Sequence, residues 1–383
     1  MSQSSLKRLK LRLQFTGWLQ YIPIAVLALI FILVAAVFWI LDFMPLAYPL
    51  VFVAAFLLAV LVFDIGTVKY HLHPREPRPE CNDHLDMFDL LRGRRSCRSF
   101  QDRKLVATDY EKLAEIVRLH SGQSDTKMIG ESAIRFEYIS APLTVWPVVG
   151  ATEFLVAIAP KKYNRLAVID VGRSLQKIVI DATRMGLATC WIGPGADQAS
   201  TVQNLGARFN AQHDHVICVC AIGYKSRYKP LFLRFVQTLQ RRRLPLSSLF
   251  FADSYFNESL DLEALTFKRF GRTFEVCQWS PSSFNGQTTR CAAVMEKKSV
   301  KKGRSDMDAQ RLVGFDFHAA TESRYYAAVA LGIWCANWEM GCSAIGVSGR
   351  FAVLSEGERG AYGDKDCLGL PRYDVSWVLD KKL

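Results

Sequence analysis

Two long stretches of the sequence contain no charged residue. The first covers residues 21–41 and the second covers residues 46–63. Each is long enough for a helix to cross the hydrocarbon core of a bilayer, which takes about 20 mostly apolar residues. Only a short turn with Asp42 and Pro45 separates them, so we expect a tight transmembrane hairpin. A cleaved signal peptide does not fit, because its apolar core is shorter and no second span would follow it directly.

The turn of this hairpin lacks cations, whereas both of its outer flanks are basic. The positive-inside rule therefore predicts that both termini and the domain that follows lie in the cytoplasm. The basic arm at residues 1–20 would also contact anionic lipid. The alternative is a buried helical hairpin of a soluble protein, which would normally show a polar face. The flanking cations are Lys7, Arg8, Lys10, Arg12, Lys69, Arg75 and Arg78.

Several familiar site patterns are missing. The ten cysteines have no regular spacing, which favours free thiols in a reducing compartment over a disulfide framework. There is no glycine-rich phosphate loop ending in Lys-Ser/Thr, and no His-Glu-x-x-His. The net charge of +12 is dispersed rather than gathered in a stripe with aromatics, so we expect no nucleic-acid partner. We also expect no metal site, because alternation along a strand would point His213 and His215 away from Cys218 and Cys220.

Beyond a proline-rich linker at residues 64–82, helical and strand patterns alternate, which suggests α/β or α+β layers. We expect one helix to begin at a capping box of Thr108 and Glu111, and another to begin at Asp170 and end at Gly186. The segment 225–245 shows no clear periodicity. Further helices are expected at 85–91, 260–278 and 319–340, and strands at 153–159, 216–224 and 373–379.

The segment Arg94-Arg95-Ser96-Cys97-Arg98-Ser99-Phe100 concentrates three guanidiniums and hydroxyls within a few residues. Such a group of fixed donors suits a phosphate monoester dianion. The alternative is a basic surface turn, since runs of like charge are usually solvated.

Two further segments combine small residues with turn formers. Ser280-Pro281-Ser282-Ser283-Phe284-Asn285-Gly286-Gln287 would let the backbone approach a planar ligand, and its asparagine could donate and accept along the ligand edge. In residues 186–195, GLATCWIGPG, the glycines would let backbone N–H groups face a ring. Taken singly, each segment could also be an ordinary connection.

Together, these segments resemble the nitroreductase family. The arginine-serine segment is similar to the motif near the start of that domain, and SPSSFNGQ is similar to its Pro-Ser-x-x-Asn-x-Gln signature. The helix start at 170–172, the turn GLATCWIGPG, and the strand and basic exit CAIGYKSRYKP are similar to the elements between them. The resemblance covers roughly residue 83 to the C-terminus.

The spacing of the two motifs resembles a single-chain subgroup of the family. In ordinary members the motifs lie close together, and two subunits share each FMN, whereas here about 180 residues separate them. The resemblance implies an α+β nitroreductase-like fold with mixed sheets flanked by helices, in which two degenerate halves form a pseudo-dimer. The halves would cover residues 83–245 and 246–383, and one FMN would lie between them, completed within one chain.

The resemblance also implies an activity and a set of cofactor-binding residues. The chain would be an FMN-dependent oxidoreductase that uses NADH or NADPH to reduce nitro compounds, quinones or similar small acceptors by a ping-pong mechanism. No dedicated acid or base would be needed. The residues that would hold FMN are Arg94, Arg95, Ser96 and Arg98 at the phosphate, Pro281, Ser282, Ser283 and Asn285 at one ring edge, the backbone of Ile192, Gly193 and Gly195, and the cluster Arg241, Arg242 and Arg243.

Two departures from the family pattern keep a second hypothesis open. The aromatic residue that often follows the motif glutamine is replaced by Thr288 and Thr289. No second arginine-serine motif is visible near residues 260–274. The alternative is therefore a non-catalytic membrane scaffold with the same fold, with or without bound flavin.

Overall fold

The computed structural model describes residues 18–121, 127–143, 145–193, 196–239, 242–297, 310–355, 357–359 and 370–381. The basic arm at residues 1–17 and the charged segment 298–309 lie outside this part of the chain.

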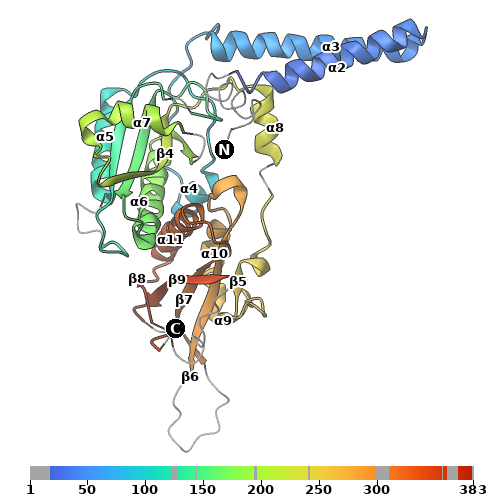
Figure 1. Ribbon diagram of the computed structural model, residues 1–383. Helices are drawn as coiled ribbons and strands as arrows, with labels where there is room; N and C mark the ends of the chain where they lie inside the picture. Colours follow the sequence, from blue (N-terminus) through green and yellow to red (C-terminus); the bar gives the residue numbers. More distant parts are fainter. Residues whose placement is uncertain are drawn as a thin grey trace, which may run out of the picture.

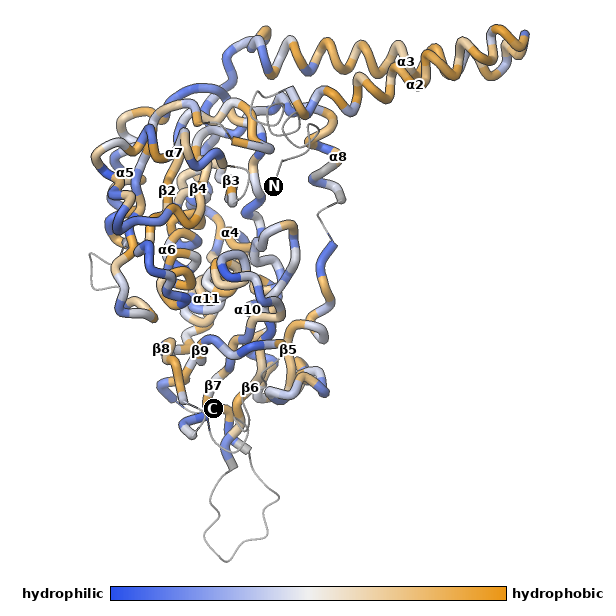
Figure 2. The backbone as a smooth tube through the Cα atoms, in the orientation of Figure 1, coloured by the Kyte–Doolittle hydropathy of each residue, from blue (hydrophilic) through white to orange (hydrophobic). Residues whose placement is uncertain are grey.

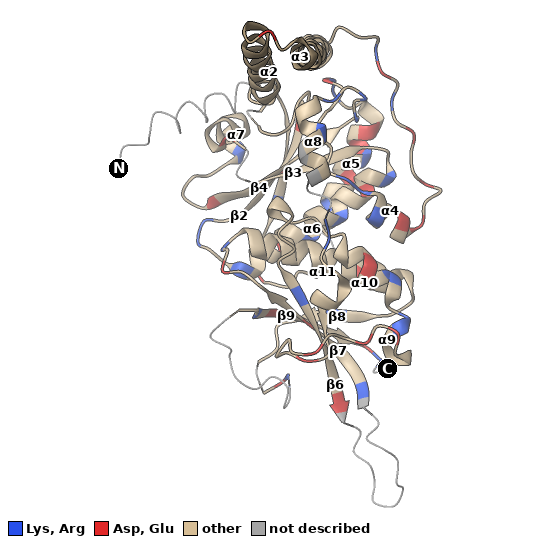
Figure 3. Ribbon diagram, turned by 90° about the vertical axis from the view of Figure 1, so that its right-hand side faces the viewer, with Lys and Arg blue, Asp and Glu red and all other residues tan. Residues whose placement is uncertain are grey.

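A helical hairpin extends from one end of the molecule (Figure 1). Helix α2 covers Ile22–Ile40 and α3 covers Met44–Asp64, continued by a π-helical turn, η1, at Ile65–Lys69. Asp42 forms the turn between them with a positive φ of 56°. Both helices are long and apolar enough to cross a membrane, and little of either is buried inside the protein. Figure 2 colours them as hydrophobic along their length, and Figure 3 shows them almost without charged residues.

The first half of the globular part contains a four-stranded sheet in the order β1-β2-β4-β3. Its antiparallel strands are β1 Arg135–Ser140, β2 Glu153–Pro160, β3 Ala188–Ile192 and β4 Asp214–Gly223. A parallel bridge joins Ser96 to Thr189 at the free edge of β3. The helices of this half are α4 Met87–Gly93, α5 Ala107–His120, α6 Arg165–Arg184, α7 Gln198–Leu205 and α8 Leu231–Leu239, with the short turn η2 at Gly206–Arg208.

The second half contains a five-stranded mixed sheet in the order β5-β6-β7-β9-β8, in which only β5 and β6 pair in parallel. An aromatic core around Trp338, Phe270 and Phe315 fills the space between this sheet and its helices. The strands are β5 Phe250–Phe251, β6 Thr289–Lys297, β7 Gln310–Ala319, β8 Gly349–Ala352 and β9 Arg372–Leu379, and the helices are α9 Leu265–Lys268, α10 Gly271–Gln278 and α11 Tyr326–Ala344, with short turns η3 Leu246–Ser248 and η4 Ser283–Asn285.

Helices α6 and α11, one from each half, pack along each other at the centre of the molecule (Figure 1). Gly172 and Gly332 allow this close approach, because a Cβ on either would overlap a carbonyl oxygen of the opposite helix. Beside them, the buried Gln176 carboxamide donates to Asn337 Oδ1 at 3.0 Å. The two halves therefore share one central interface, as expected for a pseudo-dimeric α+β fold.

Two expected helix starts are wrong. Helix α6 begins at Arg165, since the Asn164 side chain accepts from the N–H groups of Leu166 and Ala167 and so provides the cap. Asp170 lies inside the helix, fully buried, and accepts from the backbone N–H groups of residues 129 and 130 at 2.9 and 2.8 Å. Helix α5 begins after Val106 without a side-chain cap, so the expected capping box does not form.

The expected long helices are also shorter in the structure. The 260–278 segment divides into α9 and α10 at residues 269–270. Helix α11 begins only at Tyr326, and residue 319 is instead the last residue of strand β7. The segment 225–245, which lacked periodicity, contains the amphipathic helix α8. The expected strands at 153–159, 216–224 and 373–379 are confirmed as β2, β4 and β9, and the positive φ of Gly186 confirms the end of α6.

Candidate functional site

The arginine-serine segment follows the short helix α4, which the Asp86 side chain caps by accepting from Asp89 N at 2.8 Å. Arg94, directly after the helix, is only 6% exposed, and its Nη1 has no hydrogen-bond partner among the described residues. Burial, and next the nearby Arg95 charge, lower the pKa of Arg94 to about 10. A buried guanidinium with an unused donor is a site where an anion would bind favourably.

The rest of the segment runs along the free edge of β3. Cys97 N donates to the Thr189 carbonyl at 2.8 Å. The Ser96 carbonyl accepts from Gln237 of helix α8 at 3.1 Å. The charge of Arg98 acts on both Cys190 and Lys229, so its guanidinium faces the same region. The arginine-serine segment is thus held by the edge of the sheet and by helix α8.

The turn at residues 280–287 has an unusual backbone. Phe284, Asn285 and Gln287 all adopt positive φ angles, of 52°, 57° and 46°, which non-glycine residues rarely do. The hydroxyl of Ser282 accepts from Gln287 N at 2.9 Å and holds the turn closed. Strained turns of this kind are often found at ligand-binding sites.

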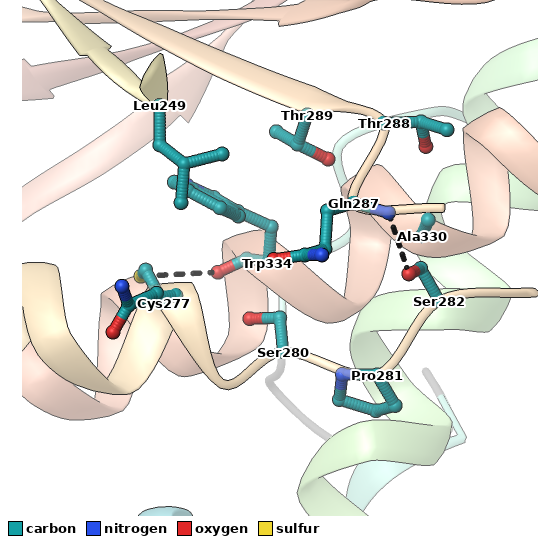
Figure 4. A pocket seen from close by; sticks show the side chains of 11 residues that line it. Leu249, Cys277, Ser280, Pro281, Ser282, Gln287, Thr288, Thr289, Ala330 and Trp334 are labelled. Carbon is teal, nitrogen blue, oxygen red and sulfur yellow. Dashed lines mark hydrogen bonds between the residues drawn. The ribbon is translucent and has the colours of Figure 1, made fainter. Parts of the chain in front are cut away.

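The cavity beside this turn is small. Figure 4 shows Ser280 and Pro281 on one side, Leu249 and Thr289 on the other, and Gln287 between them. Its volume is about 10 Å³, which is room for about one water molecule. A flavin ring therefore does not fit into this cavity itself and would have to lie against the outer surface of the turn.

The basic segment after α8 is bound to the turn. Asn285 Nδ2 donates to the Arg242 carbonyl at 2.7 Å, and the Arg243 guanidinium donates to Asn285 Oδ1. Gln287 Oε1 accepts from Leu244 N at 2.8 Å. The Asn285 carboxamide, which we expected at the edge of the flavin ring, therefore holds Arg242 and Arg243 in place.

Trp279 joins the motifs of the two halves. The Arg95 guanidinium lies 4.5 Å from its ring centroid and the Arg243 guanidinium lies 5.0 Å away. Burial, and next the charge of Arg95, lower the pKa of Arg243. Arg95 and Asn285, about 190 residues apart in the chain, are thus connected through Trp279 and Arg243 in one cationic site.

A family model described as "Putative TM nitroreductase" matches residues 86–333. The chain belongs to the nitroreductase family. The match spans both halves of the globular part, from the start of α4 into α11. No curated protein matches this nitroreductase-family chain.

Three solved structures are similar to the chain at low sequence identity. A protein from Thermotoga maritima described as a putative nitroreductase is 15% identical, with a TM-score of 0.43, covering 78% of this chain and 95% of its own. A nitroreductase with bound FMN from Bacteroides fragilis is 17% identical, with a TM-score of 0.31, covering 38% and 92%. An FMN-dependent nitroreductase from Mycobacterium smegmatis in complex with NADPH is 14% identical, with a TM-score of 0.28, covering 36% and 86%.

The remaining residues that the resemblance assigned to the flavin lie in different places. Ile192 is buried at the end of β3, and Gly193 follows it beside Tyr326 of the other half. Pro281, Ser282 and Ser283 lie in the 280–287 turn, partly exposed. Gly195 and Arg241 are outside the described residues.

Three residues of this nitroreductase-family site were missed from the sequence. Trp279 precedes the turn motif directly, and that adjacency was the available signal. Lys229 interacts electrostatically with Cys97 and Arg98, and burial lowers its pKa. Arg290 donates to the carbonyls of Gln287 and Thr289 at 2.7 and 2.9 Å, which supports the turn from behind. Lys229 belongs to the basic exit CAIGYKSRYKP, which the sequence marked without giving this residue a role. No local pattern marked Arg290, because tertiary packing alone brings it to the site.

Proposed function

We propose that the chain is a membrane-anchored, FMN-dependent oxidoreductase that uses NADH or NADPH to reduce nitro compounds, quinones or similar acceptors. The observation that carries this proposal is the buried donor of Arg94, which faces other guanidiniums and no hydrogen-bond acceptor among the described residues. Membership of the nitroreductase family makes the FMN phosphate the best candidate for the missing anion.

The described residues fit this cofactor in charge. Arg94 and Arg98 would hold the phosphate, with Ser96 beside them, while Arg95 and Arg243 would add positive potential next to Trp279. The backbone of Ile192 and Gly193 would face the ring. When bound, FMN supplies the hydride chemistry, and the fixed guanidiniums stabilise negative charge on it without reorganisation.

Exposed apolar surface supports membrane anchoring. Ile40 is 82% exposed, Phe52 73% and Val62 70%. Contact between water and an apolar surface of this size is unfavourable, and such patches mark sites of membrane or protein interaction. At the base of the hairpin, the Lys69 ammonium lies 5.1 Å from the Trp18 ring, so the two open ends meet on one side. We propose that this side, with both termini and the enzyme domain, is cytoplasmic.

The hairpin also docks on the globular part. The buried Asp64 carboxylate accepts from Leu231 N at 2.7 Å and thereby caps α8, while Ile24, Ala28 and Leu57 form an apolar cluster with the start of that helix. Since α8 also contacts Ser96, the proposed phosphate site lies close to the proposed membrane surface.

The test uses the purified full chain in detergent micelles. We expect yellow protein that releases FMN on denaturation and is bleached anaerobically by NADH or NADPH, with colour restored by a quinone or nitro compound. Colourless protein that takes up no added FMN would refute the proposal. For topology, an impermeant thiol reagent should label the exposed Cys81 of a Cys367→Ser variant in inverted vesicles but not in intact cells.

A non-catalytic scaffold is the second candidate function. It is favoured by the Asn285 carboxamide, which is already engaged by Arg242 and Arg243, and by the small volume of the turn cavity. A scaffold of this kind would retain FMN without bleaching by either nicotinamide, or would bind no FMN.

A further inference from the structure

A second and larger cavity is lined by residues outside the arginine-serine segment. It has a volume of about 310 Å³ and opens where the start of β4 meets the turn after β3 and the first residues of α11. Val216, Ile217 and Val219 of β4 contribute apolar lining. The side chains of Tyr325 and Tyr326 contribute aromatic walls from the other half of the molecule. An apolar and aromatic lining of this kind suits a planar aromatic ligand.

The rim of this cavity carries a positive charge. The Arg324 guanidinium lies 4.2 Å from the ring centroid of Tyr163 and 5.6 Å from that of Tyr325. The Tyr163 hydroxyl donates to the Arg324 carbonyl at 2.7 Å, which fixes the backbone at this point. None of the described residues that line the cavity is Asp or Glu. A guanidinium held against aromatic rings without an acidic neighbour in the lining favours an anionic ligand.

His215 adds a neutral polar group to the same rim. Its ring centroid is 5.2 Å from that of Tyr325. Burial, and next the charge of Arg324, lower the pKa of His215, so the imidazole is uncharged near neutral pH. Arg324 therefore supplies the fixed charge, while His215 can donate or accept a hydrogen bond.

The cavity adjoins the proposed flavin site through one close contact. A Cβ on Gly193 would lie 3.3 Å from Cε1 of Tyr326, so Gly193 lies directly against that ring. Ala330, one helical turn beyond Tyr326, lines the small cavity beside the 280–287 turn. Through Tyr326 and Ala330, helix α11 thus connects the larger cavity with Gly193 and with the 280–287 turn.

We propose that this cavity binds a planar aromatic anion, namely an aromatic acceptor that carries a carboxylate, with the carboxylate on Arg324. The inference rests on the proposed function for the role of this ligand as an electron acceptor. The binding itself depends only on residues of this chain and can be measured without turnover.

The experiment compares 4-nitrobenzoate with nitrobenzene by calorimetric titration of the full chain in detergent. We expect Arg324→Ala to weaken 4-nitrobenzoate binding by roughly tenfold or more, because a charge-assisted contact is lost, and to change nitrobenzene binding less than twofold. Arg324→Lys should recover part of the affinity. The matched control is Arg350→Ala, whose side chain is 62% exposed and which should leave both affinities unchanged.

Three outcomes would overturn the inference: no measurable binding of 4-nitrobenzoate, equal losses for both ligands in Arg324→Ala, or the same loss in Arg350→Ala. Repeating the titration on FMN-free protein separates this inference from the proposed function. Arg324-dependent binding in a chain that takes up no FMN would refute the oxidoreductase and retain the site. Bleaching by NADH without Arg324-dependent binding would support the oxidoreductase and refute the carboxylate site.

Discussion

Replacing Arg94 with methionine should have opposite effects on the stability of the FMN-free protein and on its affinity for FMN. Lowering the pKa from 12.5 to about 10 corresponds to about 3 kcal/mol against the charged folded form. Because the unfolded chain holds its proton more tightly, the folded protein carries this penalty at every pH below about 10. Methionine has a similar length and no charge, so Arg94→Met removes the penalty.

The FMN-free variant should therefore be more stable than the FMN-free parent, by up to about 3 kcal/mol. At about 2–4 °C per kcal/mol, the value for domains of about 150–250 residues, the Tm should rise by up to about 6–12 °C. FMN affinity should fall about 10- to 150-fold, since a charge-assisted contact contributes about 1.5–3 kcal/mol. Thermal unfolding followed by circular dichroism and titration of FMN fluorescence measure the two quantities.

Arg92→Met is the matched control, because Arg92 lies two residues before Arg94 and its side chain is 61% exposed, 3.6 Å from Glu275. Its replacement should change stability by less than about 0.5 kcal/mol and leave FMN affinity unchanged. A lower Tm for FMN-free Arg94→Met, together with unchanged FMN affinity, would show that Arg94 serves the fold rather than an anion.

Further predictions concern the helix interface, the hairpin and a buried histidine. Gly332→Ala should destabilise the protein by about 3 kcal/mol, because its Cβ would meet the backbone of α6, whereas Gly271→Ala, with nothing within 4 Å, should be neutral or slightly stabilising in denaturant unfolding. Asp64→Leu should expose α8 to limited proteolysis, since it removes the cap at Leu231 N, whereas Asp64→Asn should not. Burial lowers the pKa of His318 to about 4, so its contribution to stability is complete above about pH 6.5 and falls by about 3 kcal/mol as the pH drops to 4; Tm against pH should flatten in His318→Phe.

The strands and the hairpin could be predicted from local pattern, because a strand buried on both faces, or a helix without a polar face, leaves a continuous apolar run. The run at 153–159 became β2, and the uncharged stretches became α2 and α3. Helix starts were harder, because Asp170 looks like a cap in sequence and becomes a buried acceptor only when residues 129 and 130 fold against it. Helix α8 was missed because it is short and packs on the hairpin rather than on a long core.

The sequence alone determined which residue types and motifs are present, including the guanidiniums at 94–98, the turn at 280–287 and the spacing that implied two halves in one chain. Only the tertiary structure decided how those groups are used. It placed Trp279 between Arg95 and Arg243, engaged the Asn285 carboxamide with the basic segment, and left Arg94 buried with an unused donor. It also formed the cavity beneath Arg324 from β4 and α11. Burial and partner geometry depend on contacts between residues far apart in the chain, and no local pattern encodes them.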